Sequence, residues 1–207
     1  MGFPCCKFMN YMEKGTNYME TEKRLDIFKE ELELLSDIRI REFTKLCLAN
    51  APDYFFTDCP ASSTGKYHPL NEISWDGTII HTKKVFNVAY ALTRGLDIEN
   101  NRDAVCSACI IHDLVKRGWN GGQWTQKNHP QLAAELVNRI QKDTQLLTDS
   151  EFKIIHGSVF NHYGPWTIKR YAKPLSKYSL EELCLYISDY LASKRFLAVE
   201  YKNVEHE

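Results

Sequence analysis

Apolar residues recur at helical spacing along most of the chain. Between residues 20 and 50 they are interspersed with many charged side chains, which predicts one or two amphipathic helices. No segment shows the alternation of apolar and polar residues that marks a half-buried strand. The pattern therefore predicts an all-α protein, folded as a single compact helical bundle. After residue 50 the helices are predicted over residues 78–93, 103–116, 130–140, 149–163 and 179–200.

Capping residues mark the ends of several predicted helices. Pro130 suits the first position of its helix, because its fixed φ angle matches the helix and its missing N–H would have no partner there. Thr148 or Asp149 is expected to cap the next helix, and Ser179 the last one. Gly164, followed by proline, is expected to end the helix over 149–163.

The helical period is lost between residues 51 and 77. Pro60, Gly65, Pro69 and Gly77 punctuate this stretch, which is therefore predicted to be a long ordered loop or a few turns. Loops of this length inside a compact domain often carry function.

Composition limits the classes of protein that the chain can represent. Its 207 residues suit one domain, which we expect over residues 20–207 after a flexible tail over residues 1–19. The net charge of −1 argues against a protein that coats duplex nucleic acid. The chain has neither an apolar run long enough for a membrane span nor the start of a signal peptide, so we expect a cytoplasmic protein.

The cysteines agree with a reducing compartment, because their number is odd and they form no disulfide framework. Cys106 and Cys109 form a C-x-x-C pair, the spacing of some zinc sites. The pair lies inside an apolar helical run without a second pair, which favours small buried hydrophobic residues over metal ligands. The seven are Cys5, Cys6, Cys47, Cys59, Cys106, Cys109 and Cys184.

Several histidines and aspartates fall on the inward faces of successive predicted helices. One such residue is more often a satisfied core residue than a ligand, but a whole set on inward faces points to a shared site. Imidazole and carboxylate are the ligands of divalent ions such as Mn, Fe, Co or Zn, and an ionised carboxylate in an apolar helix is costly unless it is paired or bound to metal. The set comprises His81, His112, Asp113, His129, His162 and Asp189.

This ordered set resembles the H…HD…D pattern of the HD-domain metal-dependent phosphohydrolases. Residues 77–82 (GTIIHT) resemble the start of the family's first ligand helix, and residues 108–116 (ACIIHDLVK) resemble its HD segment. His129 and residues 162–166 resemble the further histidines of members with two metals. Residues 60–69 (PASSTGKYHP) are similar to a segment of a phage and archaeal branch.

The resemblance implies a site with one or two divalent ions, either Mn, Fe, Co or Zn, with Mg also compatible. One ion would be held by His81, His112, Asp113 and Asp189. The second would be held by Asp113 as a bridge, with His129 and His162. His156 competes with His162 for this last position, but it lies six residues earlier, which turns it away from the inward face of the helix.

Positive side chains near the ligands would complete a phosphate site. Lys116 lies three residues after Asp113, hence on the same side of a helix, and the two are the expected catalytic residues. Lys116 is also an expected substrate-binding residue. Lys66 and His68, in the loop before His81, are the other substrate-binding candidates, with an ordinary loop role as the alternative.

The chemistry implied is attack of a metal-bound hydroxide on phosphorus, because a bound divalent metal lowers the pKa of water toward neutrality. We expect a 5′-nucleotidase that removes phosphate from (deoxy)nucleoside 5′-monophosphates. Activity as a nucleoside triphosphate triphosphohydrolase, or as a cyclic-nucleotide or RNA phosphodiesterase, remains an alternative on the same site. A non-catalytic nucleotide-binding regulator is the alternative from another class.

The expected partner is a small nucleotide, with neither a membrane nor duplex nucleic acid, and homo-oligomer formation is left open. The helical segment over residues 20–50 could either mediate a dimer or cover the core. Tryptophans in or beside the predicted loops could stack on a base or cap the core. These are Trp75, Trp119, Trp124 and Trp166.

Overall fold

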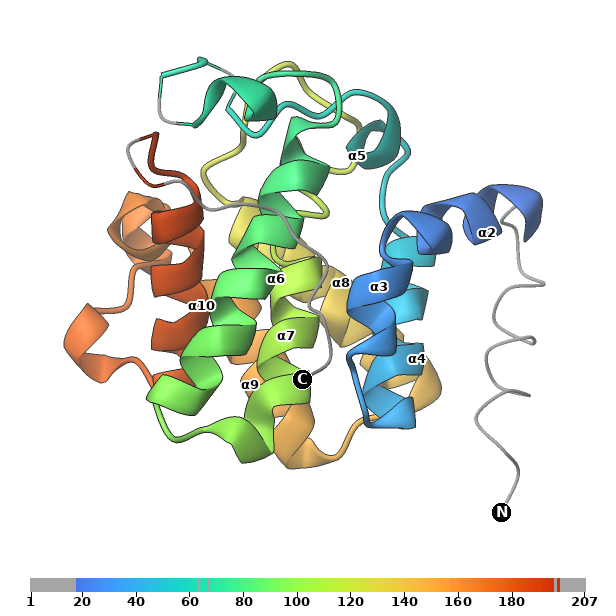
Figure 1. The fold of residues 1–207 in the computed structure, drawn as a ribbon, viewed down its shortest axis with the longest axis vertical. Coiled ribbons are helices and arrows are strands. Elements are labelled where there is room, and N and C mark those ends of the chain that lie inside the picture. Colours follow the sequence, from blue (N-terminus) through green and yellow to red (C-terminus); the bar gives the residue numbers. More distant parts are fainter. Residues whose placement is uncertain (1–17, 63, 67, 196, 198–207) are drawn as a thin grey trace.

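The computed structural model describes residues 18–62, 64–66, 68–195 and 197 (Figure 1). All regular elements in these ranges are helical, which confirms the all-α prediction. The first described helix begins at Tyr18, inside the tail predicted over residues 1–19. Residues 1–17 of that tail and residues 198–207 of the predicted domain lie outside the described ranges. The α-helices are α2 (Tyr18–Ile27), α3 (Lys29–Glu33), α4 (Ile38–Ala49), α5 (Tyr54–Thr57), α6 (Gly77–Gly95), α7 (Arg102–Ile111), α8 (His129–Thr144), α9 (Asp149–Asn161) and α10 (Leu180–Ala192).

Helix α7 lies at the centre of the bundle and contacts α4, α6, α9 and α10 (Figure 1). Every side chain from Ala104 to Ile111 is buried, because this run is apolar apart from Ser107, whose hydroxyl hydrogen-bonds with that of Thr44 at 2.7 Å. Cys106 and Cys109 are therefore core residues with free thiols, as the apolar context predicted. Burial raises the pKa of both thiols well above the usual value and keeps them protonated.

The N-terminal helices cover one side of the bundle. The segment predicted as one or two amphipathic helices forms three, because the chain turns at Phe28 and again at residues 34–37. Asp37 starts α4 as an N-cap whose side chain accepts hydrogen bonds from the backbone N–H groups of Arg39 and Ile40. Phe28 and Phe43 are fully buried, so this segment covers the core.

The predicted caps of the later helices are present. Thr148 and Ser179 each form a capping box, in which the hydroxyl accepts from the N–H of Glu151 or Glu182 and that glutamate accepts from the N–H of the capping residue. Pro130 lies in the first turn of α8. No described helix is both long and apolar enough to cross a membrane.

Three helices end earlier than their apolar pattern predicts. Helix α7 ends at Ile111 instead of residue 116, α9 at Asn161 instead of 163, and α10 at Ala192 instead of 200. In α7 and α9, the residue after the last helical one is a histidine whose ring binds a carbonyl oxygen of the last turn. A side-chain donor thus takes the place of the next backbone N–H, and the helix stops.

These helix ends meet at one end of the bundle. The C-termini of α7, α9 and α10 and the N-termini of α6 and α8 come together there, because His112, His162, Asp189, His81 and His129 contact one another. The segment between α5 and α6, teal in Figure 1, crosses the end where α6 begins. Helix C-termini carry partial negative charge, so three of them at one place favour a cation.

Candidate metal centre

The six predicted ligands lie together at this end of the bundle. The four histidines and Asp113 are at most 2% exposed, while the side chain of Asp189 is 21% exposed. Helix α7 ends at Ile111, His112 is its C-cap, and Asp113 is the next residue. The HD pair therefore lies in the turn that ends the central helix. Asp189, near the C-terminus of α10, forms the accessible edge of the cluster.

One half of the cluster joins α6, α7 and α10. The Nε2 atom of His81 lies 2.9 Å from Oδ1 of Asp189. The rings of His81 and His112 are 5.7 Å apart, and Nε2 of His112 lies 3.4 Å from Oδ2 of Asp113. These are the four residues that the resemblance assigns to the first ion.

The other half joins the same aspartate to α8 and α9. The Oδ1 atom of Asp113 lies 3.1 Å from Nε2 of His129 and 3.8 Å from Nε2 of His162. The two Nε2 atoms are 3.0 Å apart. Asp113 therefore presents one carboxylate oxygen to each half, as a bridging ligand would.

Three of the histidines are oriented by backbone carbonyl groups. The Nδ1 atom of each ring donates to the carbonyl oxygen three residues earlier, at 2.6 Å from Cys109 for His112 and at 2.7 Å for the other two. A proton on Nδ1 leaves the lone pair on Nε2, which is the state of a metal-binding imidazole. The other two pairs are His129 with Gln126 and His162 with Val159.

These ligand atoms fit a divalent cation. With Nδ1 protonated, His129 and His162 direct two Nε2 lone pairs at each other, an arrangement that a cation between them would stabilise. Nε2 of His112 and Oδ1 of Asp113 are buried and have no hydrogen-bond partner among the described residues. Unsatisfied buried acceptors are costly, and metal coordination would satisfy both. Candidate ligand atoms lie within 4.8 Å of one another in the groups His81–His112–Asp113, His112–His162–Asp189 and Asp113–His129–His162.

The carboxylates of the site are held ionised. Burial alone would raise the pKa of Asp113, but the charge of Lys116 and the contacts with His112 and His129 lower it well below its usual value. Lys116 donates to Oδ2 of Asp113 at 2.5 Å, and this partner raises the pKa of the buried ammonium despite the opposing effect of burial. Both groups thus keep their charges inside the protein.

The pKa values of His81 and His129 are shifted in opposite directions. Burial favours neutral His81, but the Asp189 and Glu72 carboxylates outweigh it and raise the pKa of His81 to about 9. Burial lowers the pKa of His129. In the absence of metal, His81 therefore keeps a proton on Nε2 and donates a hydrogen bond from it to Asp189. Metal binding at Nε2 would release that proton.

The three predicted substrate-binding residues differ in whether they contact the ligand cluster. His68 lies against the cluster, with its ring 4.7 Å from that of His81 and its Nδ1 atom 2.7 Å from Oε2 of Glu72. Lys116 is 6% exposed beside Asp113. Lys66 is exposed on the same loop as His68, and no contact among the described residues joins it to the cluster.

His156 lies outside the cluster. Its Nε2 atom contacts the side-chain amide of Asn138 at 3.1 Å, and its ring packs beside Phe152 and Phe160. The structure thus brings His162 to the other ligands and leaves His156 on another face of α9.

Two further residues of the site, Glu72 and its partner Lys84, are not predicted by the sequence patterns above. Glu72 is fully buried, although it ends a three-residue 3₁₀ helix, η1 (Leu70–Glu72), which is too short for a periodic pattern to mark a residue as inward-facing. Lys84 carried a weak signal, because it lies three residues after His81 and therefore on the same side of its helix. A buried lysine beside a ligand predicts a nearby carboxylate, but not which one.

Comparison with known proteins agrees with this site. The family model of the HD domain matches residues 78–194, more than half of the chain and all six candidate ligands. The chain belongs to the HD domain family. Neither the curated proteins nor the solved structures include a significant match. Membership in this family, together with the ligand groups, supports a metal-dependent hydrolase.

Proposed function

We propose that this HD domain protein is a divalent-metal-dependent phosphohydrolase of (deoxy)nucleoside 5′-monophosphates, from the phage and archaeal branch of the family. The observation that carries the proposal is Asp113, whose two oxygens face two separate groups of imidazole nitrogens. Such a carboxylate can bridge two ions. Ions held there would supply the nucleophilic water and neutralise charge on the phosphoryl oxygens.

Lys116 would hold the phosphate group, and His68 would accept a hydrogen bond from a hydroxyl of the substrate. The Lys116 ammonium is a buried positive charge next to Asp113, so it would bind a phosphoryl oxygen close to the ions. His68 is fixed through Nδ1, which leaves its Nε2 atom for the substrate. Burial lowers the pKa of His68 to about 4, more than its bond to Glu72 raises it, so the ring is neutral near pH 7. Lys66 would act from the rim of the loop.

A row of aromatic rings beside the ligands supports a nucleotide as the substrate. The Tyr163 ring lies 4.7 Å from His129, Trp166 lies 6.3 Å from Tyr163, and Trp166 is nearly parallel to Tyr190 at 6.2 Å. Trp166 is 50% exposed and Tyr190 is 42% exposed. Exposed stacked rings next to a phosphate site offer a face on which a base can stack.

The first test is metal content of the purified protein, followed by phosphate release from a panel of nucleotides with Mn²⁺, Co²⁺, Fe²⁺ and Mg²⁺. The proposal requires close to two ions per chain and phosphate from monophosphates, with both lost in Asp113→Asn. Triphosphate release, or cleavage of cyclic nucleotides or RNA, would replace the substrate class. A nucleotide that raises the melting temperature without turnover under any condition would indicate the regulator instead.

A further inference from the structure

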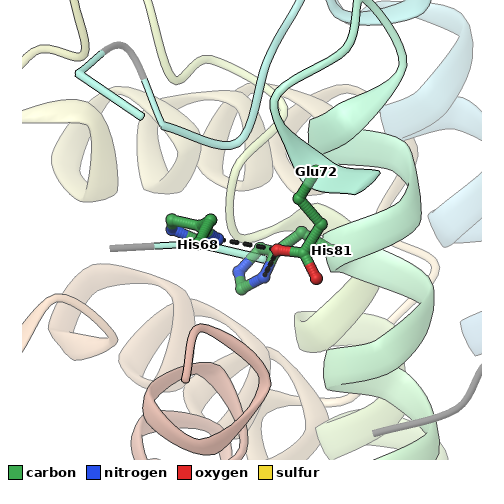
Figure 2. Close-up of side chains that lie close together, drawn as sticks. All are labelled: His68, Glu72 and His81. Carbon is green, nitrogen blue, oxygen red and sulfur yellow. Dashed lines mark hydrogen bonds and ion pairs between the residues drawn. The ribbon is translucent and has the colours of Figure 1, made fainter. Parts of the chain in front are cut away.

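A buried carboxylate outside the ligand set contacts two histidines of the site (Figure 2). We propose that Glu72 is a positioning residue that orients His81 for metal binding and His68 for substrate binding at the same time. The inference rests on the proposed metal-dependent function. It adds a residue from the loop before α6 to a site otherwise built from helix ends.

The contacts of Glu72 use both of its oxygens. Oε2 lies 2.7 Å from Nδ1 of His68 and 3.4 Å from Nδ1 of His81, and Figure 2 shows both rings turned toward it. Oε1 accepts a hydrogen bond from Nζ of Lys84 at 2.6 Å. Glu72 and His81 are fully buried and Lys84 is 5% exposed, so water does not compete for these contacts.

His81 needs an acceptor for the proton on Nδ1 once a metal is bound. Its Nε2 atom is the one that faces Asp189, hence the one that would ligate, and a ligating Nε2 requires the proton on Nδ1. In the other three histidines, the Nδ1–H group donates a hydrogen bond to a backbone carbonyl oxygen. Nδ1 of His81 is buried without a hydrogen bond in the described structure, and the oxygen that faces it belongs to Glu72.

A third cation among His68, Glu72 and His81 is less well supported, although their ligand atoms lie within 4.8 Å of one another. The ammonium of Lys84 already neutralises Glu72, and a divalent ion there would face this buried positive charge. Glu72 is instead placed to accept hydrogen bonds from three donors. A carboxylate acceptor strengthens the imidazole as a metal ligand and fixes its ring.

The backbone holds Glu72 in this position. Its carbonyl oxygen accepts from the N–H of Ala61 at 2.9 Å and lies against the first residue of α6, where a Cβ on Gly77 would be 1.9 Å from that oxygen. Beyond the end of α10, Arg195 donates to the carbonyl oxygens of Gly65 and His68. The loop is thus joined to both helices that carry His81 and Asp189.

Glu72→Gln tests the role with little change of shape. A neutral amide is a weaker acceptor, and its NH₂ group would face Lys84 or a histidine N–H. We expect the Mn²⁺ affinity, measured by titration, to fall about 10- to 100-fold, the usual effect of losing an acceptor behind a ligand. At saturating Mn²⁺, KM for a nucleoside monophosphate should still rise on the order of tenfold, because His68 loses its hydrogen bond.

Two variants separate the two effects. His68→Ala should raise KM at saturating Mn²⁺ without changing Mn²⁺ affinity. The matched control is Glu31→Gln, since Glu31 is 3% exposed and pairs with Lys83 of α6 at 2.9 Å, next to Lys84. No contact described for the structured part of the chain joins Glu31 to a histidine of the site. This control should keep the affinity for Mn²⁺ and the KM of the unmodified protein.

The outcomes distinguish the inference from the proposed function. If Glu72→Gln binds Mn²⁺ as tightly as Glu31→Gln, the positioning role is wrong and the metal site stands. If the unmodified protein binds no divalent ion, the proposed function fails and the inference with it. Nitrogen NMR of the Zn²⁺-bound, unmodified protein tests the inference independently of whether any variant folds. It should show His81 protonated at Nδ1, and protonation at Nε2 would overturn the inference.

Discussion

The Nδ1 atom of His162 binds the carbonyl oxygen of Val159, while its Nε2 atom faces His129 and Asp113. One ring thus ends α9 and offers a ligand. His162→Ala removes this ligand, and we expect the bound metal to fall from two ions to one per chain. Phosphate release should fall at least about 100-fold, the effect of losing one electrostatic contact to the transition state. Elemental analysis and a phosphate assay measure both.

His156→Ala is the control for this prediction. It removes an imidazole from the same helix, but one that packs beside Phe152 and Phe160 and contacts Asn138. Metal content and activity should be those of the unmodified protein. A loss of one ion in this variant, with two retained in His162→Ala, would reverse the assignment.

Trp166 provides a test of the base-stacking face. Trp166→Ala should raise KM for nucleoside monophosphates about 5- to 150-fold, which corresponds to a stacking energy of about 1–3 kcal/mol per base. KM for ribose 5-phosphate, which has no base, should change little. Trp119→Ala is the matched control, because Trp119 is 37% exposed and contacts Arg139 away from the ligands. Equal effects on both substrates would remove Trp166 from base recognition.

Single residues differ in how well the sequence predicts their placement. His81 and His112 could be placed because they lie on or at the end of helices whose apolar period marks the inward face. Glu72 could not, since a loop has no period and its burial depends on the partner Lys84, twelve residues later. The exposure of Lys66 could not be predicted either, because its place in the segment over residues 60–69 does not indicate whether the side chain is buried.

Helix α6 approaches the preceding loop more closely than a side chain at its first residue would allow. A Cβ at Gly77 would lie 1.9 Å from the carbonyl oxygen of Glu72 and 3.0 Å from the backbone nitrogen of Ala61. Gly77→Ala must therefore push the loop away from the helix. We expect a loss of about 1–3 kcal/mol in the free energy of unfolding, measured with urea, and weaker Mn²⁺ binding because Glu72 moves.

Gly95→Ala gives the comparison at the other end of the same helix. Among the described residues, no atom lies within 4 Å of the added Cβ, and alanine favours a helix over glycine by up to about 1 kcal/mol. This variant should be at least as stable as the unmodified protein and bind Mn²⁺ equally well. If Gly77→Ala were equally harmless, the close approach would have no energetic importance.

At the scale of elements, the starts of helices are easier to predict than their ends. The capping boxes of Thr148 and Ser179 are local patterns of a few residues, and both are present where the sequence places them. The ends of α7 and α9 depend on histidine rings that bind backbone carbonyls. Nothing in the apolar pattern distinguishes such a histidine from one that continues the helix.

The whole bundle should gain stability from metal, because the ligands come from helices α6 to α10 and an unfolded chain cannot bring them together. At an ion concentration about 100 times Kd, the gain is about 2.7 kcal/mol, or about 5–10 °C in Tm. A thermal scan with Mn²⁺ and with EDTA measures the difference. Asp113→Asn should show almost none, and a full shift in that variant would contradict a site centred on Asp113.

The sequence predicts the overall helical architecture better than it predicts the segments that connect the helices. Amphipathic and apolar helices have few ways to bury their faces, so an all-α bundle could be predicted. The arrangement of residues 51–76 could not, because it depends on backbone contacts such as those from Cys59 to Trp75 and Thr78. That segment carries His68, so the substrate side of the site was the least predictable part.

The carbonyl bonds of His112, His129 and His162 have a consequence for ion selection. Rings that are fixed to the ends of rigid helices cannot turn to follow a larger ion. Ca²⁺ prefers six to eight oxygen ligands at about 2.3–2.6 Å, whereas transition metals accept imidazole at about 2.0–2.1 Å. We therefore expect the centre to reject Ca²⁺ by radius as well as by ligand type, so that an excess of that abundant ion would leave the protein free to take up scarcer metals.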